Sequence, residues 1–361
     1  MEFLFVKPSL DILYDTTKLK TSKEVKAYIL ENNLLDLYRK CVEDKTFKFS
    51  KKEESSIIKN IANNIKKIEE KYSETKEEEN DKLEEKKIEI SKMYAECLDY
   101  DGFTKSLNDL QKTKFVTVDA LLCKIRFCFI LKRHKILDDL FEEVRLVIKI
   151  CDWDRKNKLK TYYALYLLNK GAVKESAYIF SDCLSTFNSD ELFSFEKASL
   201  YAIFTGLITF SRINFENVIF KNSDILEIKN KIPDNINMMS TYVKGDYNFF
   251  FQNLVNFTEK NIDDPFLKNR MNFFIKKIKS KIYKQIFDSY LNIKISKISE
   301  MFRISEKYIE RDIRDLIFTM NLGCKIDGIE NKIVVFQKQK DYFSKLDNLK
   351  SKYEEVIIKK K

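Results

Sequence analysis

The stretch that decides the fold is NIKISKISEMFRISEKYIERDIRDLIFTMNLGCKIDGIENKIVVF, residues 292–336. Apolar and polar residues alternate over 292–295, which is the period of a half-buried strand. Residues 296–302 then follow a helical pattern, with Ser296 as the expected N-cap. The stretch therefore begins with a short strand and a short helix.

The second half of the stretch predicts a longer helix and a hairpin. Ser305 is the expected N-cap of a helix that runs to Met320, because apolar residues recur there three or four positions apart. Two short strand patterns follow at 324–327 and 332–336, and Gly328 between them favours a tight turn. Strand, helix, turn, helix and hairpin is the order of a winged helix, which we assign to residues 292–337.

Residues 112–291 are predicted to form a right-handed solenoid of helical repeats of the tetratricopeptide type. Small and large residues stand 3, 9, 4 and 3 positions apart, as in one such repeat, at Ala164, Leu167, Ser176, Phe180 and Cys183. Small residues let two antiparallel helices approach, and large ones fill the groove between hairpins. The predicted fold class is mostly α, a solenoid followed by a winged-helix module and a C-terminal helix over 338–361.

One joint between these helices contains the single tryptophan, Trp153. Asp154 is the expected N-cap of a helix that starts near Arg155, and Gly171 is the expected C-cap that ends it. Because Trp153 lies at the joint, we expect it to be a packing wedge rather than a ligand contact.

Residues 1–111 are predicted to form an N-terminal helical region with polar joints. Its clearest helix has an apolar stripe that steps by 4, 4, 3 and 4 positions, formed by Ile57, Ile61, Ile65, Ile68 and Tyr72. Segment 66–92 is dense in Lys and Glu. This charged segment fits a solvated helix joint, which we favour, or a charged coiled-coil arm.

Composition agrees with a helical intracellular chain. Only 6 Gly and 3 Pro occur in 361 residues, whereas turns and phosphate-binding loops require both. The seven cysteines form no Cys-x-x-Cys pair, which predicts free, mostly buried thiols in a reducing compartment. No apolar run is long enough to span a bilayer and no cleavable signal is visible, so we expect no membrane association.

Catalytic chemistry finds no support in the sequence. The single histidine, His134, excludes the metalloproteases and zinc isopeptidases that need a pair of histidines. It lies in the basic run Lys132–Lys135 and is expected at the surface. No glycine-rich phosphate loop occurs. We therefore predict no catalytic residue, no metal ligand and no cofactor.

The helix-turn-helix pattern at 296–320 raises the possibility of DNA binding. The polar positions of its second helix are four acids and three bases, namely Glu306, Lys307, Glu310, Arg311, Asp312, Arg314 and Asp315. Four carboxylates would repel phosphate at close range. The net charge of +10 is also interspersed along the chain. A protein-packing role is therefore favoured over nucleic-acid binding.

Three segments resemble a known family. They are DWDRKNKLKTY at 152–162, LSTF at 184–187 with Glu191-Leu192 after it, and CKID at 324–327. Their order and separation resemble the non-ATPase subunit six family of the proteasome regulatory lid, over about residues 115–340. The related subunit one of the COP9 signalosome shares the architecture, but the first and third segments are closer to the proteasome family. Gly323 departs from the pattern, since a larger residue is usual there.

The resemblance implies a non-catalytic structural subunit of the lid of the 19S regulatory particle, which serves ubiquitin-dependent protein degradation in the cytoplasm and nucleus. Its partners in this hetero-oligomer would be the other PCI lid subunits, the proteasomal ATPase ring and the deubiquitinating subunit. The PCI module would comprise the winged helix and the helices before it. Alternative functions are a COP9 subunit-one-like scaffold, a PCI-type nucleic-acid adaptor, and an enzyme without a recognisable motif.

Two surfaces are predicted to be interfaces. The helix over 338–361 carries an apolar stripe that should join a bundle of partner helices, formed by Phe343, Leu346, Leu349, Tyr353 and Val356. On the second wing strand, Ile333 and Val335 share one face and Val334 and Phe336 the other. One face should cover the winged-helix core, and the other face, or the strand edge, should meet a neighbouring subunit. Val334 and Val335 are therefore the candidate interface residues.

Overall fold

The computed structural model describes residues 4–72, 80–108, 110, 114–149 and 151–336. Helices dominate, and their packing divides the chain into two compact units. The first unit takes the described residues up to Lys244 together with Asn253–Met271, and the second takes Gly245–Gln252 and the described residues from Asn272 onward. None of the described helices is long and apolar enough to cross a membrane.

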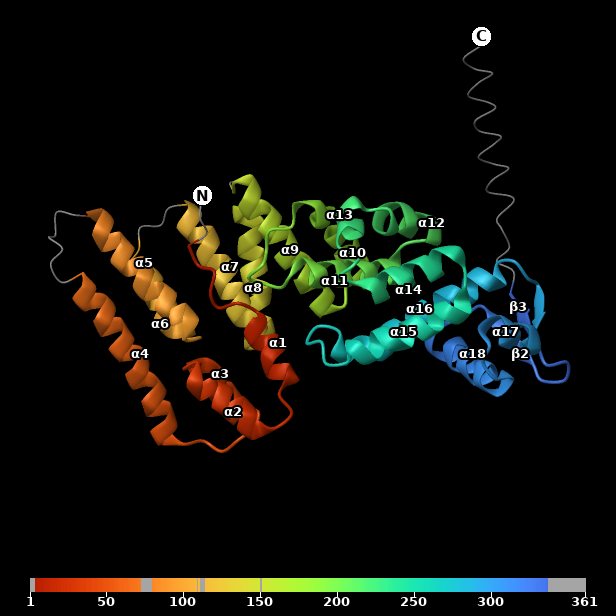
Figure 1. Cartoon of the computed structure of the whole chain (residues 1–361), viewed down its shortest axis with the longest axis horizontal. Helices are drawn as coiled ribbons and strands as arrows, with labels where there is room; N and C mark the ends of the chain where they lie inside the picture. The colour runs from red at the N-terminus through yellow and green to blue at the C-terminus, as the bar shows by residue number, and fades with distance from the viewer. Residues whose placement is uncertain (1–3, 73–79, 109, 111–113, 150, 337–361) are drawn as a thin grey trace, which may run out of the picture. The chain divides into compact units, whose positions relative to one another are not determined.

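The first unit is built from helices in succession. Its α-helices are α1 (Asp11–Lys18), α2 (Ser22–Glu31), α3 (Leu35–Glu43), α4 (Lys51–Lys71), α5 (Asn80–Glu96), α6 (Tyr100–Asn108), α7 (Lys114–Ile130), α8 (His134–Val147), α9 (Trp153–Lys170), α10 (Val173–Cys183), α11 (Phe195–Thr209), α12 (Arg212–Phe215), α13 (Ser223–Glu227) and α14 (Pro233–Lys244). Shorter turns of helix lie at Leu184–Thr186, Glu216–Phe220 and Lys268–Arg270. Neighbours in sequence pack side by side, as α4 with α5, α7 with α8, and α10 with both α9 and α11 (Figure 1). This is the packing expected of a helical-repeat solenoid.

The hairpin of α9 and α10 confirms the repeat predicted from the residue spacing. All five of its marker residues are buried, and the Ser176 hydroxyl donates a hydrogen bond of 2.8 Å to the carbonyl of Ala164 across the two helices. Gly171 ends α9 at φ 88°, in the left-handed region that only glycine adopts freely. Small residues and a glycine cap therefore produce the close hairpin.

The second unit contains the winged helix. Its elements are the start of α15 (Tyr247–Lys260), α16 (Met271–Phe287) after its first residue, β1 (Asn292–Lys294), α17 (Ile295–Phe302), α18 (Glu306–Met320), β2 (Cys324–Asp327) and β3 (Lys332–Val335). The three strands form an antiparallel sheet in the order β1-β3-β2. The predicted order of strand, two helices and hairpin is confirmed, and the strand bounds differ from the prediction by at most one residue.

The core of the winged helix comes from the apolar stripes of its helices and one face of its sheet. Ile298, Ile309, Ile313 and Ile333 are all fully buried. Phe302 at the end of α17 extends this core, since its ring lies edge-on to Phe251 and Tyr283, with ring centroids 5.0 Å and 5.5 Å apart. Burial of these side chains, at about 1.5–3 kcal/mol each, is the main stabilising contribution to the module.

Three local predictions were wrong. Trp153 is 65% exposed and opens α9, so it is not a packing wedge. Asp152, two residues before the predicted Asp154, is the N-cap of that helix. The N-cap of α17 is Lys294 rather than Ser296. Both caps lie two residues before the predicted ones, a difference within the usual one to two residues by which helix ends vary.

The charged segment 66–92 lies at the junction of α4 and α5, and residues 73–79 within it are outside the described part of the chain. The end of α4 is joined to the middle of α5 by an exposed ion pair, in which Lys71 Nζ lies 3.0 Å from a carboxylate oxygen of Glu89. Such a pair contributes about 0–1 kcal/mol. The predicted helix over 338–361, with its interface stripe, lies outside the described residues.

Candidate interaction site

The register of the winged-helix sheet decides which way each wing residue faces. Residues directly opposite one another on antiparallel strands share a face. Ile333 pairs with Ile293 on one side and Ile326 on the other, and Val335 pairs with Cys324. Ile293, Ile333 and Cys324 are all buried. Val335 therefore lies on the face of the sheet that covers the core.

Val334 lies on the opposite face. Its partners across the two ladders are Asn292 on β1 and Lys325 on β2, and Lys332 shares the same face two residues away. Both Val334 and Val335 are half-buried, and Phe336, next to them, is 57% exposed. The outer face is thus an apolar centre of Val334 and Phe336 with polar side chains around it.

The sequence also suggested a strand edge as the contact with a neighbouring subunit, but β3 has no open edge. That strand is the middle of the sheet, so its hydrogen-bonding groups are engaged on both sides. The open edges belong to β1 and β2. A shallow hollow of about 460 Å³ lies along β1, with Tyr290, Asn292, Lys294 and Lys297 among its lining residues. An exposed edge of this kind can add a strand from another chain.

The charges of α18 are arranged differently from the sequence-based interpretation. Asp312 lies 2.8 Å from Lys279 Nζ and accepts a hydrogen bond from Tyr283, while Asp315 lies 2.7 Å from Lys276. Within this module, both carboxylates are therefore paired with α16, whereas Lys307 and Arg311 are exposed. The charge argument against nucleic-acid binding is weaker than the sequence suggested.

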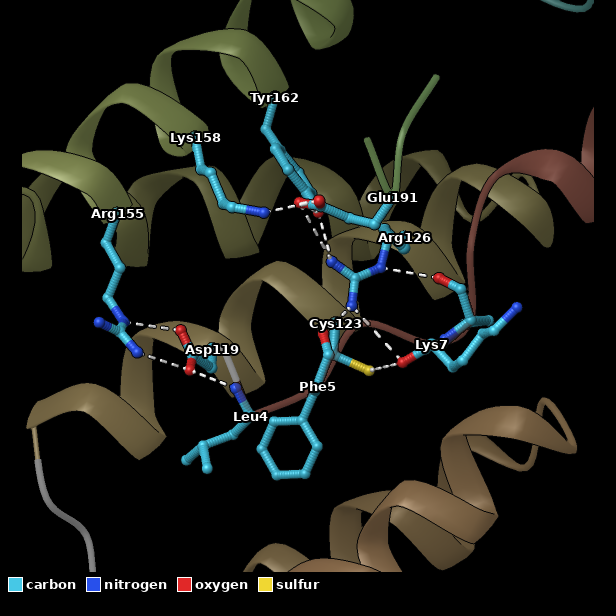
Figure 2. A network of polar contacts seen from close by, with 11 residues as sticks. Leu4, Phe5, Lys7, Asp119, Cys123, Arg126, Arg155, Lys158, Tyr162 and Glu191 are labelled. Atoms are coloured by element: carbon cyan, nitrogen blue, oxygen red, sulfur yellow. Dashed lines mark hydrogen bonds and ion pairs between the residues drawn. The ribbon is translucent and has the colours of Figure 1, made fainter. Parts of the chain in front are cut away.

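The first unit holds a second site, a buried polar network between α7 and α9 (Figure 2). Arg155 forms a two-pronged ion pair with Asp119, with Nε and a terminal nitrogen 2.7 Å and 2.9 Å from the two carboxylate oxygens. The second oxygen also accepts from the backbone N–H of Leu4, at 2.9 Å. Asp119 thereby ties α7, α9 and the N-terminal segment together.

Arg126, about two helical turns after Asp119 on the same face of α7, forms the centre of the network. Its guanidinium donates to the hydroxyl of Tyr162 and to the backbone carbonyls of Phe5 and Pro8, the last at 2.7 Å. Tyr162 in turn donates to Glu191 at 2.9 Å, and Lys158 completes the chain with a 2.6 Å contact to the same carboxylate. All of these charged groups are buried.

Burial also sets the ionisation of the network. It raises the pKa of Tyr162 well above its ordinary value, so the phenol stays neutral and donates its hydrogen bond. Burial raises the pKa of the neighbouring Cys123 thiol to about 12. Cys123 is thus a protonated donor to the carbonyl of Lys7, at 3.4 Å, rather than a reactive thiolate.

Four residues of this network, Arg155, Lys158, Tyr162 and Glu191, lie in the segments singled out in the sequence. Two regions of the chain match known families. Residues 51–218 match the family model of the 26S proteasome subunit RPN7, and residues 254–338 match that of the PCI domain. The chain is thus similar to RPN7 over residues 51–218 and to the PCI domain over residues 254–338. The described network residues of α7, α9 and Glu191 all lie within the first match, and the winged helix lies within the second.

Several similar proteins are named as regulatory subunits of the 26S proteasome. The 26S proteasome non-ATPase regulatory subunit 6 of Dictyostelium discoideum is 28% identical over 217 residues, which are 60% of this chain and 57% of that protein. The regulatory subunit rpn7 of Schizosaccharomyces pombe is 28% identical over 66% of this chain and 60% of its own length. RPN7 of Saccharomyces cerevisiae is 27% identical over 84% of this chain and 73% of its own length. The matched region thus spans somewhat over half the length of the first two relatives.

The sequence pointed to the segment 152–162 but not to its structural role. Arg155, Lys158 and Tyr162 stand three and four residues apart, which places them on one face of α9. Basic residues on an otherwise apolar helical face indicate buried polar contacts, so the sequence could have predicted a network here. Asp119 and Arg126 were missed, because nothing local marks which distant residues they meet.

The remaining predictions about chemistry concern histidine and cysteine. His134 begins α8 and is exposed, as predicted. The seven cysteines are free and five of them are buried, also as predicted. Among the described residues, no group of three or more His, Cys, Asp or Glu side chains is placed to hold a metal ion.

Proposed function

We propose that this chain is a non-catalytic structural subunit of the lid of the 26S proteasome regulatory particle, and that it scaffolds lid assembly for ubiquitin-dependent degradation. The observation that carries the proposal is the RPN7 match over residues 51–218, followed by a PCI module. The three relatives above are all proteasome regulatory subunits by name, which favours the proteasome lid over the COP9 signalosome.

The partners we propose are the other PCI subunits of the lid, the ATPase ring and the deubiquitinating subunit, in the cytoplasm and nucleus. The winged helix would contact a neighbouring PCI subunit through the outer sheet face at Val334 and an open strand edge. The helix predicted over 338–361 would bury its stripe against helices of partner subunits. A single amphipathic helix is marginal alone, so burial in a bundle supplies its stability.

Affinity purification of the tagged chain tests this function. We expect proteasomal ATPases and proteolytic core subunits to co-purify with it after nuclease treatment. Recovery of signalosome subunits instead would indicate a COP9 scaffold. Recovery of RNA-bound complexes that are lost on nuclease treatment would indicate a nucleic-acid adaptor. A variant lacking residues 340–361 should fold and yet fail to recover the lid, whereas normal recovery would remove the bundle helix from the proposal.

The absence of catalysis is part of the same proposal. With one histidine and no phosphate loop, we expect no hydrolase, isopeptidase or ATPase activity from the purified chain. An activity that a single substitution in this chain abolishes would contradict the scaffold function.

A further inference from the structure

Residues Leu4–Leu10, here called the strap, are held on the first unit chiefly through their main chain (Figure 2). The Leu4 N–H donates to Asp119, and the carbonyls of Phe5 and Pro8 accept from Arg126. At the far end, the Leu10 N–H donates 2.9 Å to the carbonyl of Glu191. Strap residues at both ends and in the middle are thus fixed by groups more than a hundred positions away in sequence.

The strap carbonyls accept hydrogen bonds from Arg126 that the carboxylate of Glu191 is too distant to accept. Arg126 is 1% exposed, and the nearest oxygen of Glu191 is 3.9 Å from its guanidinium. A buried guanidinium must have its donors satisfied. The main chain of the strap supplies acceptors for it. The site therefore receives the backbone of the strap through hydrogen bonds to its carbonyls.

The strap is also held by four buried side chains, those of Phe5, Pro8, Ser9 and Leu10. Phe5 is 2% exposed and its ring lies edge-on to Phe103, with centroids 5.3 Å apart. Pro8 is buried as well. Between them Val6 is 52% exposed, and Lys7 is exposed too. The fit is close, because the space left between the strap and the network is only about 10 Å³.

We propose that the surface around Asp119 and Arg126 is a binding site for a Phe-x-x-Pro segment, which the chain's own strap occupies in cis. Main-chain hydrogen bonds to a strand-like segment, with one aromatic anchor and tolerant positions between, are the means by which domains bind extended peptides in trans. The same contacts can therefore be made by a separate peptide once the strap is weakened. This inference does not depend on the proposed function.

The test uses the full chain with Phe5→Ala, which weakens the strap and leaves its covalent connection intact. The probe is a peptide of residues 1–12, MEFLFVKPSLDI, labelled at its C-terminus and titrated by fluorescence anisotropy. We expect it to bind the variant with a dissociation constant below about 1 mM, the effective concentration typical of a short intramolecular segment. Wild type should bind at least about tenfold more weakly, because its intact strap competes.

Two controls make the result specific. The same peptide with its phenylalanine at position 5 replaced by alanine should have an affinity at least about tenfold lower, since it lacks the buried anchor. Adding Arg126→Lys to the Phe5→Ala chain keeps the charge but loses the planar fork, and should weaken binding by a similar factor. Circular dichroism and melting of each variant establish that it is folded. A variant lacking residues 1–8 provides a second receptor.

The result for folded Phe5→Ala decides the inference. Binding that depends on both the peptide phenylalanine and Arg126 supports the site. No binding to this variant at about 1 mM peptide, or binding unchanged by the alanine peptide and by Arg126→Lys, overturns it. If the truncated chain does not fold, the Phe5→Ala titration still gives the answer.

Discussion

The carboxylate of Asp119 on α7 receives two parallel hydrogen bonds from Arg155 on α9, at 2.7 Å and 2.9 Å, and both side chains are at most 2% exposed. The two residues are 36 positions apart in the sequence, and their pair joins α7 to α9. A bidentate pair withdrawn from water depends on both of its members. Without Asp119, the buried Arg155 would keep Asp152, 3.1 Å away and 34% exposed, as a charged partner.

Asp119→Ala should therefore lower the free energy of unfolding by about 3–5 kcal/mol. The measurement is urea denaturation followed by circular dichroism. The matched control is Asp182→Ala, whose carboxylate lies 2.7 Å from Lys160 but is 66% exposed. That exposed pair should cost about 0–1 kcal/mol. Equal losses in the two variants would show that burial does not set the strength of the Asp119 pair.

The two wing valines should respond oppositely to a charge. Val335→Lys places an ammonium on the core face beside Cys324, and should lower the free energy of unfolding by about 1–3 kcal/mol. Val334→Lys lies on the outer face beside Asn292 and Lys325, and should melt like wild type while recovering fewer neighbouring subunits in a pull-down. If Val334→Lys assembles normally, the outer sheet face is not an interface.

A buried tyrosine pair in the first unit gives a graded prediction. Tyr201 donates to the buried carboxylate of Asp264 at 3.0 Å, and Tyr14 lies 2.9 Å from the Tyr201 oxygen and so donates to it. Tyr201→Phe removes a bond to a charged acceptor, about 1.5–3 kcal/mol, and Tyr14→Phe removes a neutral one, about 0.5–1.5 kcal/mol. Thermal melting of both variants checks the order, and the reverse order would contradict this hydrogen-bond direction.

Thiol reactivity should follow burial. Cys41 and Cys151 are half-buried, whereas burial raises the pKa of both Cys123 and Cys128 to about 12. At pH 8.5 iodoacetamide should therefore modify Cys41 and Cys151 first, and the two buried thiols only after unfolding. Peptide mass spectrometry over time checks this. Early modification of Cys123 would mean that its site opens in the native state.

The same pKa shifts give a dependence of stability on pH. The thiols of Cys123 and Cys128 hold their protons to about 12 in the folded chain, above the ordinary value of 9.0. As pH rises past 9.0, the unfolded chain therefore loses these protons first and becomes more favourable. Stability should be insensitive to these groups below about pH 8 and fall between about pH 9 and 12. Chemical denaturation at pH 7.5 and 10 measures the difference, and replacing Cys128 by alanine should reduce it.

Local chemistry accounts for what could be predicted about the winged helix and about the end of α9. The spans of β2 and β3 and the position of Gly171 follow from alternation, turn residues and backbone freedom, which act over a few neighbouring residues. The N-caps of α9 and α17 were misplaced for the opposite reason. Tertiary packing can extend a helix past a residue that favours a cap, and no local pattern reports that packing.

The sequence by itself determined the mostly helical class, the winged-helix order and the resemblance to RPN7-type proteins, because helical and strand periods and motif runs are written in adjacent residues. Only the tertiary structure decided that Val335 faces the core and Val334 faces outward, since that depends on which strands pair and in what register. It alone also brought Leu4 to Asp119 across 115 positions. Burial of charge makes such a contact strong, and burial is a property of the folded chain rather than of any segment.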